Sequence, residues 1–262
     1  MSVSPATLVA VVGTGTEVGK TWVSERLLRA WRAGGLTVAA RKPAQSFSPG
    51  EGPTDADRLG AASGEDPLEV CPSHRWYPVP MAPPMAAAVL GRPAPVLAEL
   101  VAELCWAPSG SGPGPGSGSG SGLGSGSGPG SGPGSGMGPG PNVGLVETAG
   151  GVRSPQADDG DAVDLLGALQ PDRVVLVADA GLGTINGVRL AVEALTSGTT
   201  AAVVVVLNRF SPASDLHRRN RTWLTDRCGL DVVTSPAAVS EPVPPVVADL
   251  AGRLATPAPG RT

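Results

Sequence analysis

A glycine-rich stretch near the start of the chain carries the residues best suited to bind phosphate. It reads Gly-Thr-Gly-Thr-Glu-Val-Gly-Lys-Thr over residues 13–21, after an apolar run and before a segment with apolar side chains at helical spacing. A strand, a glycine-rich turn, Gly-Lys-Thr and a helix make a phosphate-binding loop, in which backbone N–H groups and the helix N-terminus surround phosphate oxygens. Lys20 would reach the β- and γ-phosphates, and the Thr21 hydroxyl would ligate Mg²⁺.

Other polar residues follow strands that the sequence predicts further along. Lys42 follows the second strand, Glu147 ends the third and Asn208 follows a strongly β-branched run. The carboxyl ends of parallel strands meet at one edge of a sheet, so we expect these groups to converge on the phosphate loop. Glu147 is placed to hold Mg²⁺, and Lys42 to stabilise charge on a transferred group.

A second carboxylate ligand is expected near the start of the helix that follows Lys42. Asp55 and Asp57 are the two candidates. Either could instead cap that helix, which is a common role of aspartate at such a position.

The elements that must position these groups alternate along the chain. Strands are predicted over residues 7–12, 37–41, 143–147, 174–178, 201–207 and 232–233. Helices are predicted over residues 22–33, 55–63, 84–90, 96–106, 162–169, 186–196, 216–227 and 246–254, with a loop over 43–54. This alternation predicts an α/β fold with a doubly wound, mainly parallel sheet and helices on both faces, as in P-loop NTPases.

Residues 108–142 interrupt this pattern, because they consist almost wholly of Gly, Ser and Pro. Such a composition offers no side chains for a core and is typical of a flexible linker. Neither flanking part has enough strands for a complete sheet. We therefore expect one domain over residues 1–262 with a low-complexity insert.

The composition of the chain bears on its partners and on its cellular compartment. The net charge of −4 gives no general attraction to nucleic acid or an anionic membrane, so neither is expected as a partner. Three cysteines without C-x-x-C spacing read as reduced cytosolic thiols. The first strand starts too early for a signal peptide, and no apolar run reaches the roughly 18 residues of a membrane span. A cytoplasmic protein is expected.

Lysine is rare, since only two of the 19 lysine and arginine residues are lysines, Lys20 and Lys42. Arginine evidently fills the ordinary basic positions. Where lysine persists, a compact and flexible ammonium group is indicated. Both lysines follow predicted strands, which supports a shared functional role.

These motifs together resemble the dethiobiotin synthetase family. The resemblance is carried by residues 13–21, by Arg41-Lys42-Pro43 with Ser46, and by the string Asp-Ala-Asp-Arg-Leu at 55–59. It continues in Met-Ala-Pro-Pro at 81–84, Val-Glu-Thr-Ala-Gly-Gly at 146–151, Gly-Leu-Gly-Thr-Ile-Asn at 181–186 and Leu-Asn at 207–208. The motifs occur in family order and span nearly the whole chain outside the insert.

The resemblance implies roles for individual residues. Lys42 and Lys20 would be catalytic; Ser46, Thr16 and Lys42 would contact the substrate; and Thr21, Asp55 and Glu147 would ligate Mg²⁺, with Asp55 favoured over Asp57. Asn208 would read the adenine edge, and the segment near Pro236 would line the base. The implied nucleotide-binding residues are Thr16, Glu17, Val18, Gly19, Lys20, Thr21, Trp22, Asp55, Glu147, Thr148, Ala149, Gly150, Asn208, Arg209 and Pro236.

The implied activity is that of an ATP-dependent cyclo-ligase in biotin biosynthesis. It would carboxylate 7,8-diaminononanoate with CO₂, pass through a carbamate and a carbamic-phosphoric anhydride, and close a ureido ring. The resemblance then implies ATP as a co-substrate and Mg²⁺ as a cofactor. It also implies a second copy of the chain as a partner, because the family is homodimeric.

Three other readings share the same nucleotide domain. An amidating ligase of the cobyrinate type would need an added glutaminase domain, for which the chain has no room. A partitioning-type ATPase switch typically has a second lysine in the phosphate loop, where this chain has Gly15 and Thr16. A degenerate, non-catalytic homologue is the third.

Overall fold

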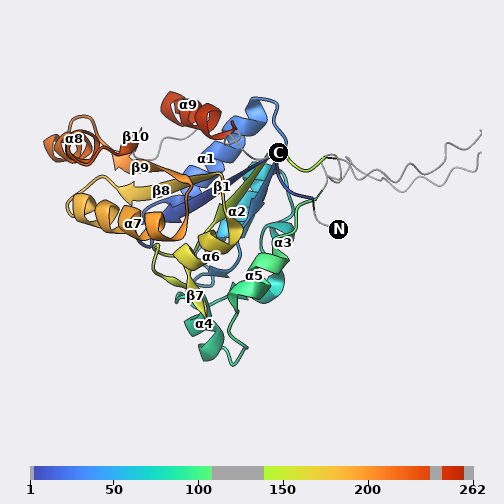
Figure 1. Cartoon of the computed structure of the whole chain (residues 1–262). Coiled ribbons are helices and arrows are strands. Elements are labelled where there is room, and N and C mark those ends of the chain that lie inside the picture. Colours follow the sequence, from blue (N-terminus) through green and yellow to red (C-terminus); the bar gives the residue numbers. More distant parts are fainter. Residues whose placement is uncertain (1–2, 108–138, 237–243, 257–262) are drawn as a thin grey trace, which may run out of the picture.

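The computed structural model describes residues 3–107, 139–236 and 244–256, and a six-stranded sheet forms their centre (Figure 1). The strand order is β10-β9-β8-β1-β5-β2, and every neighbouring pair is parallel. The strands are β1 (Thr7–Gly13), β2 (Val38–Arg41), β5 (Val143–Glu147), β8 (Arg173–Asp179), β9 (Ala202–Phe210) and β10 (Asp231–Pro236).

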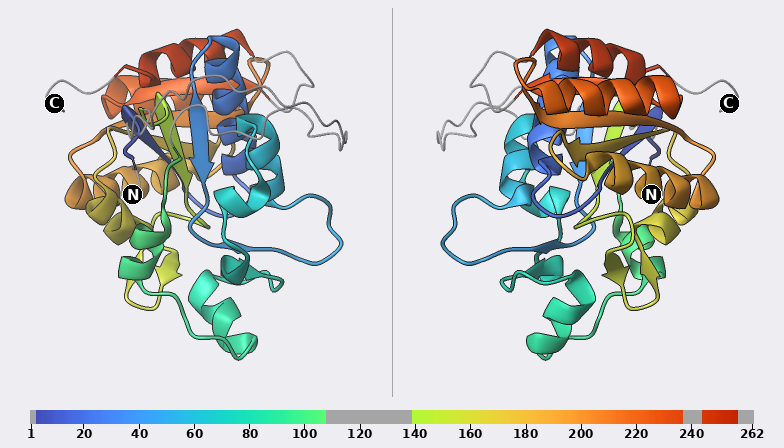
Figure 2. Two further views of the ribbon diagram at one scale, coloured as in Figure 1. Left: turned by 90° about the vertical axis from the view of Figure 1, so that its right-hand side faces the viewer. Right: turned by 90° about the vertical axis from the view of Figure 1, so that its left-hand side faces the viewer.

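Helices cover both faces of this sheet (Figure 2). One face carries α1 (Lys20–Ala33), α2 (Asp55–Ser63), α3 (Pro67–Val70) and α9 (Pro245–Leu254). The other carries α6 (Ala162–Leu169), α7 (Thr184–Gly198), and α8 (Asp215–Thr222) continued by the π-helical turn η2 (Trp223–Arg227). The doubly wound α/β fold expected from the sequence is confirmed.

Strand β1 shows how the two cores are divided. Val9 and Val11 pack with α1, α2 and α9, whereas Ala10 and Val12 pack with α6 and α7. Successive side chains of a strand point to opposite faces of a sheet, so a run of small apolar residues can serve two cores at once.

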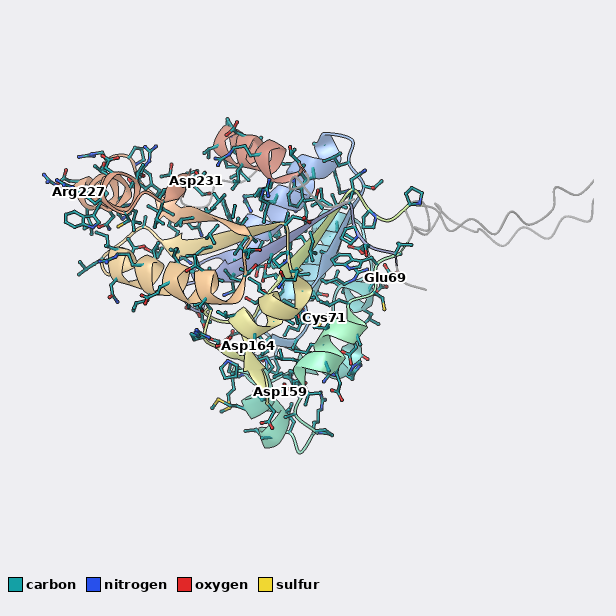
Figure 3. The ribbon with its side chains drawn as sticks, in the orientation of Figure 1. Glu69, Cys71, Asp159, Asp164, Arg227 and Asp231 are labelled. Atoms are coloured by element: carbon teal, nitrogen blue, oxygen red, sulfur yellow. The ribbon has the colours of Figure 1, made fainter. Side chains whose placement is uncertain are left out.

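Short elements extend the sheet edge that carries the phosphate loop. They are β3 (Gln45–Ser46) paired with β4 (Trp76–Tyr77), the antiparallel pair β6 (Pro155–Ala157) and β7 (Gly160–Asp161), the 3₁₀ turn η1 (Ser73–Arg75), α4 (Pro83–Val89) and α5 (Leu97–Glu103). Figure 3 shows Glu69 and Cys71 on the β2 side and Asp231 and Arg227 on the opposite, β10 side. In the described part of the chain, no helix is long and apolar enough to cross a membrane.

Several predicted boundaries were wrong where tertiary contacts decide the local structure. The helix predicted over 96–106 ends at Glu103, because Arg41 donates a hydrogen bond to the Cys105 carbonyl and lies 4.9 Å over the Trp106 ring. The loop predicted over 43–54 contains β3, whose two-residue pairing with β4 leaves no periodic signal in the sequence.

Strand β9 also extends beyond its predicted end at residue 207. Asn208 pairs in register with Asp179 of β8, and Phe210 pairs with Pro236 of β10. Asn208 therefore lies within a strand and not in a loop after it.

The predicted insert falls mainly outside the described residues, which resume at 139. Its last two positions are tied to the fold. Pro141 and Asn142 accept backbone hydrogen bonds from Ala6 and Thr7, and the Asn142 side chain accepts one from the Thr37 backbone at 2.8 Å.

Candidate active site

The phosphate loop lies between β1 and α1, and its glycines fit tight local surroundings. Gly19 is the residue before α1 and has φ 96°, a left-handed conformation that glycine adopts readily. A Cβ there would lie 2.0 Å from Asn208 Nδ2. A Cβ on Gly13 would lie 3.0 Å from the Gly15 carbonyl oxygen. Gly19 is thus required by close approach, and Gly13 lies in tight surroundings.

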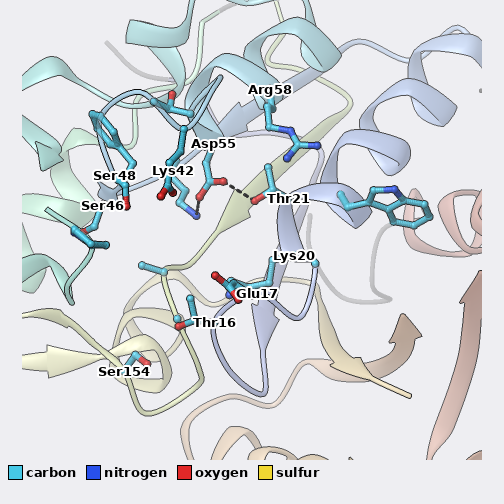
Figure 4. Close-up of a pocket in the computed structure, with 18 of the residues that line it drawn as sticks. Thr16, Glu17, Lys20, Thr21, Lys42, Ser46, Ser48, Asp55, Arg58 and Ser154 are labelled. Atoms are coloured by element: carbon cyan, nitrogen blue, oxygen red, sulfur yellow. Dashed lines mark hydrogen bonds and ion pairs between the residues drawn. The ribbon is translucent and has the colours of Figure 1, made fainter. Parts of the chain in front are cut away.

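Four side chains, from α1, α2, β5 and the residue after β2, meet beside this loop, and Figure 4 shows Thr21, Lys42 and Asp55 among them. The Thr21 hydroxyl oxygen lies 2.8 Å from Asp55 Oδ1 and 2.8 Å from Glu147 Oε1. Lys42 Nζ lies 2.7 Å from Asp55 Oδ2 and 2.8 Å from Glu147 Oε1. One ammonium group thus bridges the two carboxylates that share the threonine hydroxyl.

Asp55 and Asp57 have different surroundings. Asp57 closes a capping box with Thr54, in which its carboxylate accepts from the Thr54 backbone N–H at 2.8 Å. Asp55 instead faces Thr21 and Lys42. Asp57 is therefore a helix-capping acid, and Asp55 is the carboxylate that the structure brings to the cluster.

Thr21, Lys42 and Asp55 line a cavity of about 820 Å³. The loop and Lys20 form one side, and Ser46 and the segment before α4 form another. Figure 4 shows Ser154 across from Ser46. The buried Ser46 hydroxyl has no hydrogen-bond partner among the described residues, so it can bind a molecule in the cavity.

The loop after β5 supplies the far wall. Gln156 donates to the Ala149 carbonyl and accepts from the Ala149 N–H, at 2.8 and 2.9 Å. Gly150 has φ 64°, and a Cβ there would lie 2.4 Å from Ser154 Oγ. Thr148 lies behind this wall, fully buried, with its N–H donated to Val11 and without a positive φ. A side chain at 148 therefore causes no left-handed strain.

The end of β9 contacts the loop from the other side. Asn208 Nδ2 donates to the Val18 carbonyl at 3.0 Å, and Arg209 also lines the cavity. Trp22 lies at its edge, with the Arg26 guanidinium 3.7 Å above the indole ring.

Four residues of the predicted set do not line the cavity: Val18, Glu147, Thr148 and Pro236. Glu147 is fully buried and reaches the cluster through hydrogen bonds from Thr21 and Lys42. Pro236 ends β10 beside Phe210, and residues 237–243 after it lie outside the described residues.

Comparisons with known proteins bear on the family of this chain. A family model described as an AAA domain matches residues 141–239. The ATP-dependent dethiobiotin synthetase BioD of Anaeromyxobacter sp. (strain K) is 38% identical over 208 residues, which cover 78% of this chain and 78% of that protein. The protein of the same name from Haloferax mediterranei is 33% identical over 227 residues, covering 87% and 82%.

The chain belongs to the dethiobiotin synthetase family. Among solved structures, the signal recognition particle receptor FtsY from Elizabethkingia anophelis matches with a TM-score of 0.44 and 12% identity over 97% of this chain and 67% of that one. That likeness is too distant to bear on function.

The Thr21, Asp55 and Glu147 side chains fit a magnesium ion. Mg²⁺ prefers oxygen ligands, typically one or two carboxylates together with phosphate oxygens and water. Here two carboxylates from α2 and β5 converge on one hydroxyl at the end of the phosphate loop.

The two lysines of the chain have opposite electrostatic surroundings. Burial, helped by the nearby Lys42 ammonium, lowers the pKa of Lys20 to about 8. Burial alone would also lower the pKa of Lys42, but the Asp55 and Glu147 carboxylates outweigh it and raise that pKa above its ordinary value. The same Lys42 ammonium overcomes the effect of burial on Asp55 and lowers the pKa of that carboxyl.

Sequence reasoning missed three residues that hold the site in place. Ser24, one turn after Thr21, donates to Glu147 Oε2 at 2.6 Å, and helical spacing could have revealed it. Gln45 accepts from the Ala56 N–H at 2.9 Å and so fixes the start of α2. Gln156, which holds Ala149, carries no recognisable local signal, because its partner is set by tertiary structure.

Proposed function

We propose that this protein is an ATP- and Mg²⁺-dependent dethiobiotin synthetase, and that residues 1–262 form one ligase domain. The observation that carries the proposal is the position of the two lysines, since both line the same cavity beside the Thr21, Asp55 and Glu147 oxygens. Family membership supports the same reaction, because the relatives are named ATP-dependent dethiobiotin synthetases.

The proposed reaction forms a cyclic urea in three steps. One amine of 7,8-diaminononanoate adds to CO₂ and loses a proton, giving a carbamate. A carbamate oxygen attacks the γ-phosphorus of ATP, and ADP leaves. The second amine then attacks the carbonyl carbon of the mixed anhydride, phosphate leaves, and the ring closes. The balance is diamine, CO₂ and ATP to dethiobiotin, ADP and phosphate.

The residues of the cavity would position and neutralise these groups. The loop from Thr16 to Trp22 would hold the phosphates, with Lys20 on the β- and γ-oxygens. Lys42 would lie against the transferred phosphoryl group and the carbamate oxygen, and Ser46 and Thr16 would contact the substrate. Thr21, Asp55 and Glu147 would hold Mg²⁺, which neutralises phosphate charge. Catalysis of this kind depends mainly on positioning and charge stabilisation.

The nucleotide base is proposed to lie beyond the end of β9. Asn208 is nearly fully buried there, and its Nδ2 is already donated to Val18. Its amide oxygen would accept a hydrogen bond from the adenine amino group, and the segment from Pro236 onward would line the base.

Product analysis tests the proposal directly. The purified protein is incubated with ATP, Mg²⁺, bicarbonate and 7,8-diaminononanoate, and dethiobiotin is measured by mass spectrometry. We expect one dethiobiotin per ADP formed. A folded protein that binds ATP but yields no dethiobiotin would exclude the ligase function and favour a non-catalytic homologue.

We also propose that the protein acts as a homodimer. On α4, Met85 and Val89 lie four residues apart and are 57% and 62% exposed, so an apolar stripe faces outward near the cavity. Sedimentation equilibrium tests this: a purely monomeric protein at concentrations that support turnover would contradict it.

A further inference from the structure

Two consecutive residues at the end of β9 bind two consecutive carbonyls of the phosphate loop. Asn208 Nδ2 donates to the Val18 carbonyl at 3.0 Å, and Arg209 Nη2 donates to the Glu17 carbonyl at 2.5 Å. The loop is therefore attached to the sheet by side chains as well as through β1 and α1.

These bonds fix the direction of loop N–H groups. In a trans peptide the C=O and N–H bonds point in opposite directions, because the unit is planar. The Glu17 carbonyl shares its peptide with the Val18 N–H, so holding the carbonyl toward Arg209 turns that N–H away from β9. Phosphate-binding loops act through such N–H groups, and a flipped peptide would present a carbonyl oxygen to the phosphate instead.

Backbone strain at both ends marks this contact. Glu17 has φ 59° and Arg209 has φ 54°, which are left-handed conformations for residues other than glycine. Each costs on the order of 1–2 kcal/mol, so surrounding contacts must maintain it. The hydrogen bond from Arg209 to Glu17 joins the two strained residues directly.

Asp179 aims the Arg209 side chain. Asp179 Oδ2 lies 2.9 Å from Arg209 Nη1, and its other oxygen accepts from the Gly181 N–H at 2.8 Å. A guanidinium group is a rigid fork, so tying one nitrogen to a carboxylate directs the other. Asp179 does not line the cavity.

We propose that Asp179 and Arg209 are a positioning pair that sets the orientation of the Glu17–Val18 peptide, so that the Val18 N–H is available to a nucleotide phosphate. This inference rests on the proposed nucleotide-binding function of the loop. Neither residue takes part in the chemistry.

One substitution distinguishes a positioning role of Arg209 from direct contact with phosphate, because the two roles predict opposite effects on ATP binding. Asp179→Asn removes the negative partner of Arg209 without removing the arginine. If Arg209 bound phosphate through its charge, this change would strengthen ATP binding. If the pair positions the peptide, the same change releases Arg209 and weakens ATP binding.

Calorimetric ATP titration of the whole chain separates the two cases. We expect Asp179→Asn and Arg209→Ala each to weaken ATP binding about tenfold, and the double variant to bind no more weakly than Arg209→Ala, because contacting residues are coupled. The KM for ATP should rise in each single variant, while in Asp179→Asn kcat at saturating ATP stays near that of the wild type.

The ion pair of Asp231 and Arg253 is a matched control. Its side chains are 46% and 43% exposed, and those of Asp179 and Arg209 are 47% and 50% exposed. Asp231→Asn should leave ATP binding unchanged. ATP binding by Asp179→Asn that equals or exceeds that of the wild type would overturn the positioning pair.

A spectroscopic readout tests the pair without nucleotide. Labelling glutamate carbonyls with ¹³C and valine nitrogens with ¹⁵N marks only Glu-Val peptides, which are Glu17–Val18 and Glu69–Val70. Asp179→Asn and Arg209→Ala should each shift the first signal and leave the second, in α3, in place. An unmoved Glu17–Val18 signal would overturn the proposal, whereas a wild-type protein that binds no ATP would instead overturn the proposed function.

Discussion

At the residue scale, the site depends on two lysines in different protonation environments. Lys20 is nearly fully buried beside Lys42, and its ammonium donates a hydrogen bond to the Gly15 carbonyl at 3.0 Å. Lys42 is held between two carboxylates. Lys20 can therefore bind an added anion, whereas Lys42 is already paired with two carboxylates.

The scarcity of lysine makes this difference measurable. In protein labelled with ¹³C at lysine Cε, two signals are expected: one titrating near pH 8, from Lys20, and one that keeps its proton well above that pH, from Lys42. A bound phosphate favours the ammonium form, so ATP should raise the Lys20 midpoint. By linkage, ATP affinity should fall as the pH rises through about 8 in the free protein. Two signals with equal midpoints near 10.5 would contradict the assignment.

Substitution of Lys42 separates binding from chemistry. Lys42→Ala removes charge from the proposed transfer site and leaves the loop intact, so we expect dethiobiotin formation to fall by at least about a thousandfold. ATP binding should change by less than tenfold. Removing Lys42 also leaves the Asp55 and Glu147 carboxylates unpaired, so the comparison is made with Mg²⁺ present and after thermal denaturation shows a folded variant. Wild-type turnover in Lys42→Ala would disprove its catalytic role.

At the element scale, the junction of β1, the loop and α1 is built for close approach to β9. Gly19 and Gly183 are both left-handed residues before a helix, with φ 96° and 90°. They differ in surroundings, because a Cβ on Gly183 meets nothing within 4 Å whereas one on Gly19 meets Asn208.

Comparing alanine variants of these two glycines separates the steric clash with Asn208 from the cost of the left-handed backbone. Gly183→Ala should lower the free energy of unfolding by about 1–2 kcal/mol, the cost of left-handed alanine. Gly19→Ala should cost more than Gly183→Ala and should also abolish ATP binding, since Asn208 and the loop cannot keep their positions. Urea denaturation of the two variants provides the comparison. Equal losses of stability would show that Asn208 yields without cost.

At the scale of the whole molecule, a low-complexity segment joins two halves of one sheet. Strands β1 and β2 come from before it, and β5 lies between them in the sheet although it comes from after it. The chain therefore has to close this segment before its central strands can pair.

Shortening that segment should do little to stability. Closure entropy changes by roughly 0.6 kcal/mol for each doubling of loop length, so reducing residues 108–138 to about a quarter of their length should stabilise the fold by about 1.2 kcal/mol. Dethiobiotin formation should persist. Chemical denaturation and product analysis of the shortened chain check both expectations, and loss of folding would show that the segment has a structural role.

The sequence by itself determined the main elements of the fold and the bounds of some of them. Alternating apolar runs and helical repeats are local signals, so β5, α2 and α6 have the predicted bounds. The residues after β1, β2 and β5 could be proposed as a site because parallel strands share one carboxyl edge.

Only the tertiary structure decided which of these residues touch. Asp55 and Asp57 are equivalent by spacing, yet one faces Lys42 and the other caps a helix, because α2 presents them on different sides. The hydrogen-bond partners of Arg41, Gln156 and Asp179 cannot be found from the sequence. Some lie far away along the chain, and others are contacted only because a side chain points in one particular direction. Such contacts leave no periodic pattern, and they hold the phosphate loop and its neighbouring walls in place.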